Sequence, residues 1–398
     1  MSKHLYYTDS HLLNFEARVV ESGVLNDRPF VVLDESAFYP TTGGQPHDTG
    51  SLGDRRVVDV IDRETDDAVM HVLDGPLDVG TRVAATVDWP RRLDHMQQHT
   101  GQHLLSAAFV RLFQIPTVSF HLGAELSTID LTGTPGPDVI ARAEEEANRV
   151  VWENRPVSIR FVGPDEAARL PLRKEPVRGG TLRLVEVEDF DLSACGGTHV
   201  TRTGTVGIIA VQAWERYKGG TRISFACGGR VLAHFRAYRE VVAIAVRQLS
   251  IQPAELPDAV ARLQGETREM RQQARALTGQ LATYEADVLA SGARDAGGMR
   301  LVCSVVEGRD ATALKSLAQA IVARPGHVVV LVGGSRPVVV VAARSADATA
   351  DAAQVVKTLI GRFGGKGGGR PEGAQGGGLD AEPETVRAAA YELLSASR

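Results

Sequence analysis

Two short segments, far apart in the sequence, carry residue types that bind transition metals. One reads His99-Thr-Gly-Gln-His103 and the other reads Cys195-Gly-Gly-Thr-His199. In a helix, residues four apart lie on one face about one turn from each other, so His99 and His103 can hold one ion. Two glycines let the second segment turn sharply enough to direct both its ligands at one point. One thiolate and three imidazoles form a set that suits tetrahedral zinc.

Each of these pairs also has a simpler interpretation. Surface helices carry histidines at this spacing by chance, and a cysteine beside two glycines can be a buried thiol next to a turn. The helical pair lacks the internal glutamate of zinc proteases, which argues against peptidase chemistry. Four protein ligands are typical of a structural zinc site, whereas a catalytic zinc usually keeps an open position. Cys227 and Cys303 have no comparable histidine neighbours and are interpreted as core thiols.

A second candidate is the segment FYPTTGGQPHDTG, residues 38–50, which contains Thr42 and Gln45. It is ordinary turn chemistry, but its hydroxyls, amide and exposed backbone could also bind a small polar ligand. The residues leave these two interpretations open. His121, in the run SFHLG, is typical of a half-buried strand histidine and could instead line a pocket.

The patterning around these segments predicts an α+β multidomain protein. Short alternating runs such as TRVAATVDW predict a small β-barrel over residues 1–90. Apolar residues at helical spacing from Arg91 to Phe113, followed by strand patterns, predict an α+β domain over 91–228. We expect a helical arm over 229–298 and a small α/β module over 299–398.

The last two parts carry features that suggest interactions. Between Leu256 and Val288, apolar residues follow alternating steps of four and three, which is typical of a coiled coil. This seam predicts either an arm folded back on the preceding helix or a homodimer formed through the arm or the C-terminal module. The tract GGKGGGRPEGAQGGG, residues 364–378, is followed by a helical pattern, which favours a functional loop over a linker.

Composition narrows the class of protein. The chain has 398 residues, is 43% hydrophobic and 23% charged, and carries a net charge of −5. This charge gives no global attraction to nucleic acid, so any RNA contact must come from local basic patches. Three scattered cysteines cannot form a disulfide framework, and no apolar run approaches the roughly 20 residues that span a bilayer. We expect a cytoplasmic protein with no membrane partner.

Four separated stretches together resemble the AlaX proteins, freestanding relatives of the editing domain of alanyl-tRNA synthetase. They are FYPTTGGQPHDTG, HTGQHLL, VSFHLGAELSTIDL and SACGGTHVTRTGTVGII. Their order and approximate spacing match over about residues 10–228. The region 300–398 resembles the C-terminal module of alanyl-tRNA synthetases, so the chain looks like the long form of AlaX. The aminoacylation half of the synthetase has no counterpart in this sequence. The resemblance therefore implies a protein that edits mischarged tRNA but does not attach amino acids to tRNA.

The resemblance implies a zinc-dependent, ATP-independent hydrolase that removes serine, and perhaps glycine, from mischarged alanine tRNA. It maps the zinc ligands onto His99, His103, Cys195 and His199, and it leaves out His95. Thr42 first, and then Gln45, are the candidates for reading the serine hydroxyl. A site that binds this hydroxyl rejects alanine, because alanine leaves the buried polar groups unpaired.

Other residues have roles that follow from their place near this site. His121 is expected to orient water or the terminal adenosine, and Asp130 is either an acceptor for a metal-bound histidine or a structural residue. The basic residues expected to contact RNA are Arg216, Lys218, Arg222, Lys366 and Arg370. Weaker candidates in the same clusters are Arg173, Lys174, Arg178, Arg202, Trp214 and Tyr217.

Two alternatives remain from the residues. One keeps the fold and edits another mischarged tRNA, of the threonine type. The other is a non-catalytic zinc-containing tRNA-binding protein in which the metal is purely structural and the arm is a dimer interface.

Overall fold

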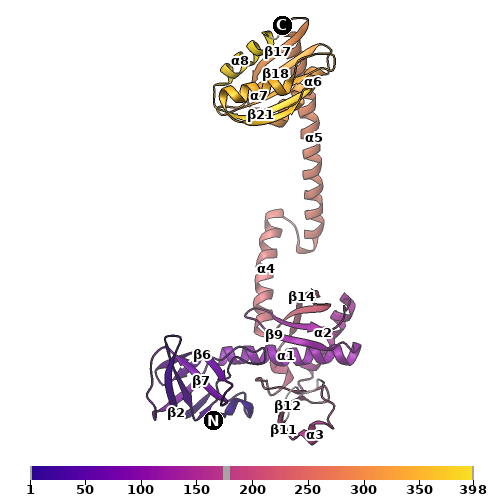
Figure 1. Ribbon diagram of the computed structural model, residues 1–398. Coiled ribbons are helices and arrows are strands. Elements are labelled where there is room, and N and C mark those ends of the chain that lie inside the picture. Colours follow the sequence, from indigo (N-terminus) through magenta and orange to yellow (C-terminus); the bar gives the residue numbers. More distant parts are fainter. Residues whose placement is uncertain (1, 174–179, 397–398) are drawn as a thin grey trace. The chain divides into compact units, whose positions relative to one another are not determined.

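The computed structural model describes residues 2–173 and 180–396. The chain divides into two compact units, Met1–Ala245 and Val246–Arg398. Both units combine helices with β-sheets, which confirms the predicted mixed α+β class (Figure 1). The boundary between the units falls inside helix α4 (Gly229–Leu249).

A closed β-barrel forms the first part of the N-terminal unit. In the order of pairing, its strands are β2 (Asn14–Leu25), β3 (Arg28–Leu33), β7 (Ala68–Leu73), β6 (Arg55–Arg63), β5 (Gly50–Leu52) and β8 (Arg82–Val87). Strand β8 alternates exposed and buried residues along its whole length, as a strand with one face inside a barrel must. Val19, Leu33 and Leu73 are fully buried in the interior. A short parallel pair, β1 (Lys3–His4) and β4 (Glu35–Ser36), accompanies the barrel.

Helix α1 (Trp89–Phe113) follows the barrel and is enclosed by the rest of the unit. Its backbone begins at Asp88 in an extended conformation, and Pro90 lies in the first turn, where its missing N–H costs no hydrogen bond. Every residue from 98 to 109 is buried, because α1 packs against helix, strand and turn elements around it. Polar residues on this helix are therefore interior residues that need partners.

Two antiparallel sheets and a second long helix complete the N-terminal unit. One sheet has the order β14 (Ile209–Tyr217), β15 (Gly220–Cys227), β10 (Ser127–Leu131) and β9 (Thr117–Leu122). The other has the order β11 (Val157–Val162), β12 (Leu182–Val187) and β13 (Asp191–Ala194). The helices are α2 (Pro137–Trp152) and the short α3 (Pro164–Ala167). The core includes Leu104, Phe109 and Ile223, all fully buried.

The C-terminal unit is a sheet between two layers of helices. The strand order is β16 (Arg294–Ala296), β17 (Met299–Val306), β18 (His327–Gly333), β19 (Val338–Arg344), β21 (Gly373–Leu379) and β20 (Lys366–Arg370). One face packs on the end of α5 (Leu256–Ser291) and on α6 (Ala311–Val322). The other face packs on α7 (Ala352–Phe363) and α8 (Pro383–Ser395).

The glycine-rich tract is not a loop, so the prediction for residues 364–378 was wrong in this respect. Most of the tract forms the hairpin β20–β21, which pairs Lys366 with Gly377 and Arg370 with Gly373. A side chain at Gly367 or Gly369 would lie within about 2.4 Å of the opposite strand's backbone. The glycines therefore permit a close hairpin instead of a mobile segment. Strand β20 is exposed along its whole length at the edge of the sheet.

The apolar seam of the arm lies on the surface of α5. Its exposed members are Val260, Leu263, Met270, Leu277, Leu281, Tyr284 and Val288. Alanines near the end of the helix, including Ala282 and Ala286, face the sheet instead. The seam is therefore a face distinct from the one that anchors α5 to its own unit.

Within the described ranges, none of the helices combines the length and the apolar character that crossing a bilayer requires.

Candidate metal centre and adjoining turn

The four residues predicted as metal ligands come together in the N-terminal unit. One ligand atom from each of His99, His103, Cys195 and His199 lies within 4.8 Å of all the others. Cys195 Sγ lies 3.3 Å from His99 Nε2 and 3.4 Å from His199 Nε2. The three histidines are buried and Cys195 is partly exposed. His99 and Cys195 are 96 residues apart in the sequence, so the cluster joins helix α1 to a distant loop.

A separate partner holds the Nδ1 atom of each imidazole. His99 Nδ1 lies 2.8 Å from Gln45 Oε1, and His103 Nδ1 lies 2.9 Å from Asp191 Oδ2. His199 Nδ1 lies 3.1 Å from the hydroxyl of Thr100. Amide and carboxylate oxygens accept, so His99 and His103 carry their proton on Nδ1 and direct the Nε2 lone pair toward the cluster. This outer set of partners is the one that metal-binding histidines require.

The loop between Cys195 and His199 is shaped by contacts that only glycine allows. A Cβ atom on Gly197 would lie 2.1 Å from His99 Cε1, whereas one on Gly196 would meet nothing closer than 3.7 Å. The backbone N–H of Gly197 points at Cys195 Sγ, 3.4 Å away. Gly197 is thus required because the loop passes directly beside a ligand ring.

The electrostatics of the cluster favour a thiolate at Cys195 and a neutral imidazole at His199, whereas Asp191 and the Cys195 sulfur outweigh burial and raise the pKa of His103. Burial alone would raise the pKa of the Cys195 thiol, but the nearby rings of His99 and His199, together with the contact to His103, bring it well below its usual range. Burial lowers the pKa of His199 to about 3. A deprotonated sulfur and neutral ring nitrogens are the forms that bind a metal. The donor set, its burial and its outer partners fit zinc.

Cys227 is a buried core thiol, as predicted, whereas Cys303 is partly buried beside the core of the C-terminal unit. Cys227 packs against Gly101 of α1, where a Cβ atom would lie 2.3 Å from its sulfur. Burial raises the pKa of Cys227 above its usual value and that of Cys303 to about 12. Neither thiol is poised for metal binding at neutral pH.

The turn that contains Thr42 and Gln45 joins the metal cluster from the barrel side. Thr42 and Gln45 bond to each other through their backbones, at 3.1 and 2.9 Å, and Gly43 and Gly44 between them have φ values of 57° and 84°. The segment is therefore a tight turn and also a neighbour of the cluster. Gln45 is 1% exposed and its amide is bonded to His99, whereas Thr42 is exposed.

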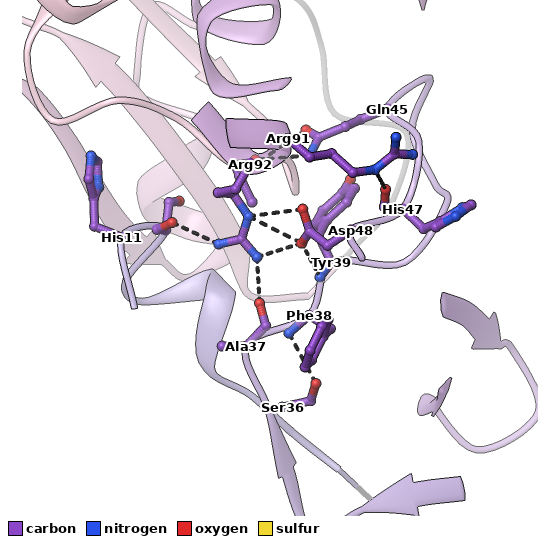
Figure 2. Close-up of polar contacts among 12 residues, drawn as sticks. His11, Ser36, Ala37, Phe38, Tyr39, Gln45, His47, Asp48, Arg91 and Arg92 are labelled. Carbon is purple, nitrogen blue, oxygen red and sulfur yellow. Dashed lines mark hydrogen bonds and ion pairs between the residues drawn. The ribbon is translucent and has the colours of Figure 1, made fainter. Parts of the chain in front are cut away.

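A buried ion pair holds both ends of this turn (Figure 2). Tyr39 and Asp48 bond to each other across the base of the segment, and the Asp48 carboxylate is bound by Arg92 of α1. Arg92 also donates to the carbonyls of Ser10 and Ala37, at 2.7 and 2.5 Å. The side chains of Arg92 and Asp48 are fully buried. We call this buried Arg92–Asp48 pair the clamp. Arg92 lies seven residues, about two turns, before His99, so one face of α1 carries both the arginine of the clamp and the two histidines of the cluster.

His121 lies on β9 beside the cluster but is exposed. Its neighbour Phe120 packs on His99, with ring centroids 5.2 Å apart. Side chains alternate across a strand, so His121 lies on the face opposite Phe120. The structure thus brings Phe120 to the metal ligands, and His121 remains accessible at the surface.

The interpretation of Asp130 as an acceptor for a metal-binding histidine was wrong, because Asp130 bonds to other residues. Its carboxylate is bound by Arg222, at 2.7 and 2.9 Å, and by Ser119 at 2.5 Å. The acceptor for a ligand histidine is Asp191, which the sequence analysis missed. Asp191 lies on β13, four residues before Cys195, and an acidic residue on the strand that leads into the cysteine loop was the available signal.

Two arginines near the cluster have structural partners. Arg173 donates to Asp191 at 2.6 Å, so this candidate RNA contact supports His103 instead. Arg183, which sequence analysis did not single out, donates from Nη1 to the carbonyl of Cys195 and from Nε to that of Tyr7. It is 8% exposed, and burial lowers the pKa of its guanidinium.

The basic residues predicted to bind RNA form two groups, one in each unit. Arg216 and Lys218 are exposed at the end of hairpin β14–β15, near the exposed Trp214. Arg222, on the same hairpin, bonds Asp130 and lies 3.6 Å from the centroid of the Tyr217 ring. Arg202 is exposed as well. The candidates Lys174 and Arg178 lie outside the described residues.

The second group belongs to the C-terminal unit. Lys366 and Arg370 are the exposed first and last residues of the edge strand β20. Arg370, Lys315 and neighbouring glycines line one hollow of this unit.

Comparisons with known proteins place these features in a class. Three family models match: "tRNA synthetases class II (A)" over residues 3–91, "Threonyl and Alanyl tRNA synthetase second additional domain" over 182–224, and "DHHA1 domain" over 298–396. The second includes the strand that carries Asp191 and the whole cysteine loop. The fold and the metal cluster thus define a relative of class II synthetases of the alanyl and threonyl type.

Individual relatives narrow this class. The chain is 30% identical to "Alanyl-tRNA editing protein AlaX-L" of Pyrococcus horikoshii, over 99% of this chain and 98% of that protein. It therefore belongs to the AlaX family of alanyl-tRNA editing proteins, in its long form. It is also 32% and 34% identical to the alanine–tRNA ligases of Pyrococcus abyssi and Pyrococcus furiosus. In each case 94% of this chain matches, but it spans only 42% of the ligase.

Among solved structures, the chain is similar to the C-Ala domain of Aquifex aeolicus alanyl-tRNA synthetase. The identity is 25%, the TM-score is 0.24, and the match covers 26% of this chain and 97% of that domain.

Proposed function

We propose that this protein is a trans-editing hydrolase that deacylates mischarged seryl-tRNA, and glycyl-tRNA, of the alanine type. Its membership of the AlaX family supports this assignment. The observation that carries it is the hydrogen-bonded connection between the turn of Thr42 and the metal cluster, which runs through Gln45 to His99. A hydroxyl-bearing turn beside a metal centre suits an amino acid that differs from alanine by one hydroxyl.

Zinc is the proposed cofactor, and His99, His103, Cys195 and His199 would hold it. A bound zinc can lower the pKa of water toward about 7 or polarise and orient an ester. The four protein ligands together form a closed set, which is typical of a metal that organises its site. In this proposal, the protein residues hold the reading turn, the cysteine loop and α1 in one fixed arrangement around the substrate.

Thr42 is the proposed reader of serine. Its side chain is exposed on a turn whose backbone is fixed by Gln45 and by the Tyr39 hydroxyl, which lies 3.3 Å from the Thr42 carbonyl. An alanine-sized activation pocket discriminates against an added hydroxyl by only about 100-fold, so a second site that binds this hydroxyl is useful. The bond to the ribose is an activated ester, and positioned water is sufficient to cleave it. His121, accessible on β9, is proposed to contact the terminal adenosine.

The proposed partner is alanine tRNA. Arg216 and Lys218 are exposed and can contact its phosphates, and Trp214, 48% exposed, can stack on an unpaired base. Arg222 forms an ion pair with Asp130, and we propose that it contacts the tRNA while it keeps this pair. Lys366 and Arg370 would contact RNA separately, from an edge strand whose glycines allow close approach of phosphates.

We also propose a homodimer, formed through the exposed seam of α5 or through the C-terminal module, and a cytoplasmic location. Replacing Leu281 by Glu in the seam should shift sedimentation toward the monomer. The matched change Gln272→Glu, about half a turn away around the helix, should not.

A deacylation assay tests the proposed function. Purified protein should hydrolyse seryl-tRNA of the alanine type, spare correctly charged alanyl-tRNA, and lose activity on metal removal by a chelator. Cys195→Ala and His103→Ala should lose zinc and activity together, and full activity in a zinc-free variant would exclude the metal site. Preference for seryl-tRNA of the threonine type would assign the other editing reaction. Tight tRNA binding without hydrolysis would indicate a non-catalytic role.

A further inference from the structure

The side-chain amide of Gln45 makes three hydrogen bonds, all of them to the metal cluster and its loop. Its oxygen lies 2.8 Å from His99 Nδ1 and 3.2 Å from the backbone nitrogen of Thr198. Its nitrogen donates to the Thr198 hydroxyl at 2.9 Å. With two N–H groups on the oxygen and 1% exposure, the amide has little capacity left for a substrate hydroxyl.

The backbone of Thr198 fixes which way round this amide lies. A backbone N–H can only donate, so the Gln45 atom that faces it must be the oxygen. The same oxygen faces His99 Nδ1, which must therefore carry the proton. The lone pair of His99 then lies on Nε2, 3.3 Å from Cys195 Sγ. One N–H in the cysteine loop thus sets the tautomer of a ligand on α1.

We propose that Gln45 is a positioning residue of the metal centre and not a reader of the substrate. This inference deepens the proposed function and rests on it for the identity of the reaction. Gln45 orients His99 and fastens the loop of Cys195 and His199 to the turn that carries Thr42. The reading turn and the metal ligands consequently share one hydrogen-bonded unit.

The neighbouring contacts explain why Gln45 can do this. Gly44 lies against β9, where its carbonyl accepts from Leu122 N–H at 2.9 Å and a Cβ atom would lie 2.8 Å from the Phe120 carbonyl. The other side of the turn is held by Asp48, which Arg92 binds. The turn is therefore supported from both sides, and its backbone holds Gln45 beside His99.

Metal affinity, measured without tRNA, tests the proposal. Gln45→Met keeps the length of the side chain but removes the acceptor, and it should weaken zinc or cobalt binding by about 10- to 100-fold. The cobalt-loaded variant should also show a changed thiolate-to-metal absorption band. The matched control is Thr42→Val in the same turn, which should leave metal affinity unchanged and reduce the preference for serine over alanine.

A second variant keeps the test decisive if Gln45→Met does not fold. Gln45→Glu retains oxygen acceptors for both N–H groups and should bind metal at least as tightly as the natural protein. Wild-type metal affinity and spectrum in Gln45→Met, or weakening by tenfold or more in Gln45→Glu, would overturn the proposal. Failure to hydrolyse seryl-tRNA, with the metal results as expected, would instead reject the proposed function alone.

Discussion

The carboxylate of Asp191 joins His103 to Arg173. Its Oδ2 atom lies 2.9 Å from His103 Nδ1, and its Oδ1 atom accepts from Arg173 at 2.6 Å. The hydroxyl of Ser193 also donates to this carboxylate, at 3.0 and 3.2 Å. Burial would raise the pKa of Asp191, but the His103 hydrogen bond and Arg173 outweigh it and lower the pKa to about 2. A permanent negative charge therefore lies behind one metal ligand.

Replacing Asp191 by Asn should weaken metal binding by about 10- to 100-fold, because the amide keeps the shape of the side chain but loses the charge behind His103. A competition titration against a chelator measures the effect. Asp130→Asn serves as the control, since Asp130 is bound to Arg222 and does not contact a ligand. Equal losses in the two variants would show that the charge behind His103 has no special role.

Gly197→Ala should abolish metal binding and hydrolysis, because the new methyl group would overlap the His99 ring. Gly196→Ala, one residue earlier, should retain both, because its Cβ atom would make only ordinary contact with Tyr7. Metal analysis of the two purified proteins checks the contrast. A Gly197→Ala protein with full metal content would require the loop to adopt another path.

Part of the candidate site could be predicted from the sequence, and part could not. The clustering of His99, His103, Cys195 and His199 could be predicted because helical spacing and a glycine-containing pair depend on local geometry. The roles of Asp191, Thr100 and Arg183 could not be predicted, because their contacts with His103, His199 and Cys195 depend on the packing of segments that are separate in the sequence. The glycine-rich tract was interpreted as a loop because composition does not show that a neighbouring strand lies close enough to require glycine.

Arg92→Ala should destabilise the protein by about 3–5 kcal/mol, because it leaves the fully buried Asp48 carboxylate without its partner. Denaturant unfolding measures the change. The comparison variant is Arg149→Ala, whose pairs with Glu146 and Glu153 lie at the surface and should contribute far less to stability. A loss at Arg92 no larger than at Arg149 would contradict the clamp described above.

The barrel contains a histidine that should make stability depend on pH. His71 is fully buried between Ser36 Oγ, at 2.8 Å, and the Val31 carbonyl, at 3.3 Å, and burial lowers its pKa from 6.5 to about 4. Between these values the unfolded chain binds a proton that the folded chain does not. Through His71 alone, stability should therefore fall as the pH decreases from about 6.5 toward 4, by roughly 3 kcal/mol.

Unfolding curves at several pH values check this dependence. His71→Gln, which cannot titrate, should be less stable at neutral pH and should have a flatter acid limb. His121→Gln, at an exposed position, should leave the pH profile unchanged. An acid limb in His71→Gln as steep as that of the natural protein would assign the effect to other groups.

The turn contributed by the barrel has a consequence for dissection of the chain. A fragment that begins after residue 90 would retain all four metal ligands. It would nevertheless lack Gln45, which fixes the proton of His99, and Asp48, which neutralises Arg92 inside the protein. The boundary between the barrel and helix α1 therefore separates two structural elements but does not separate the residues of the candidate site. A cluster with the geometry described here therefore needs residues from both parts of the chain.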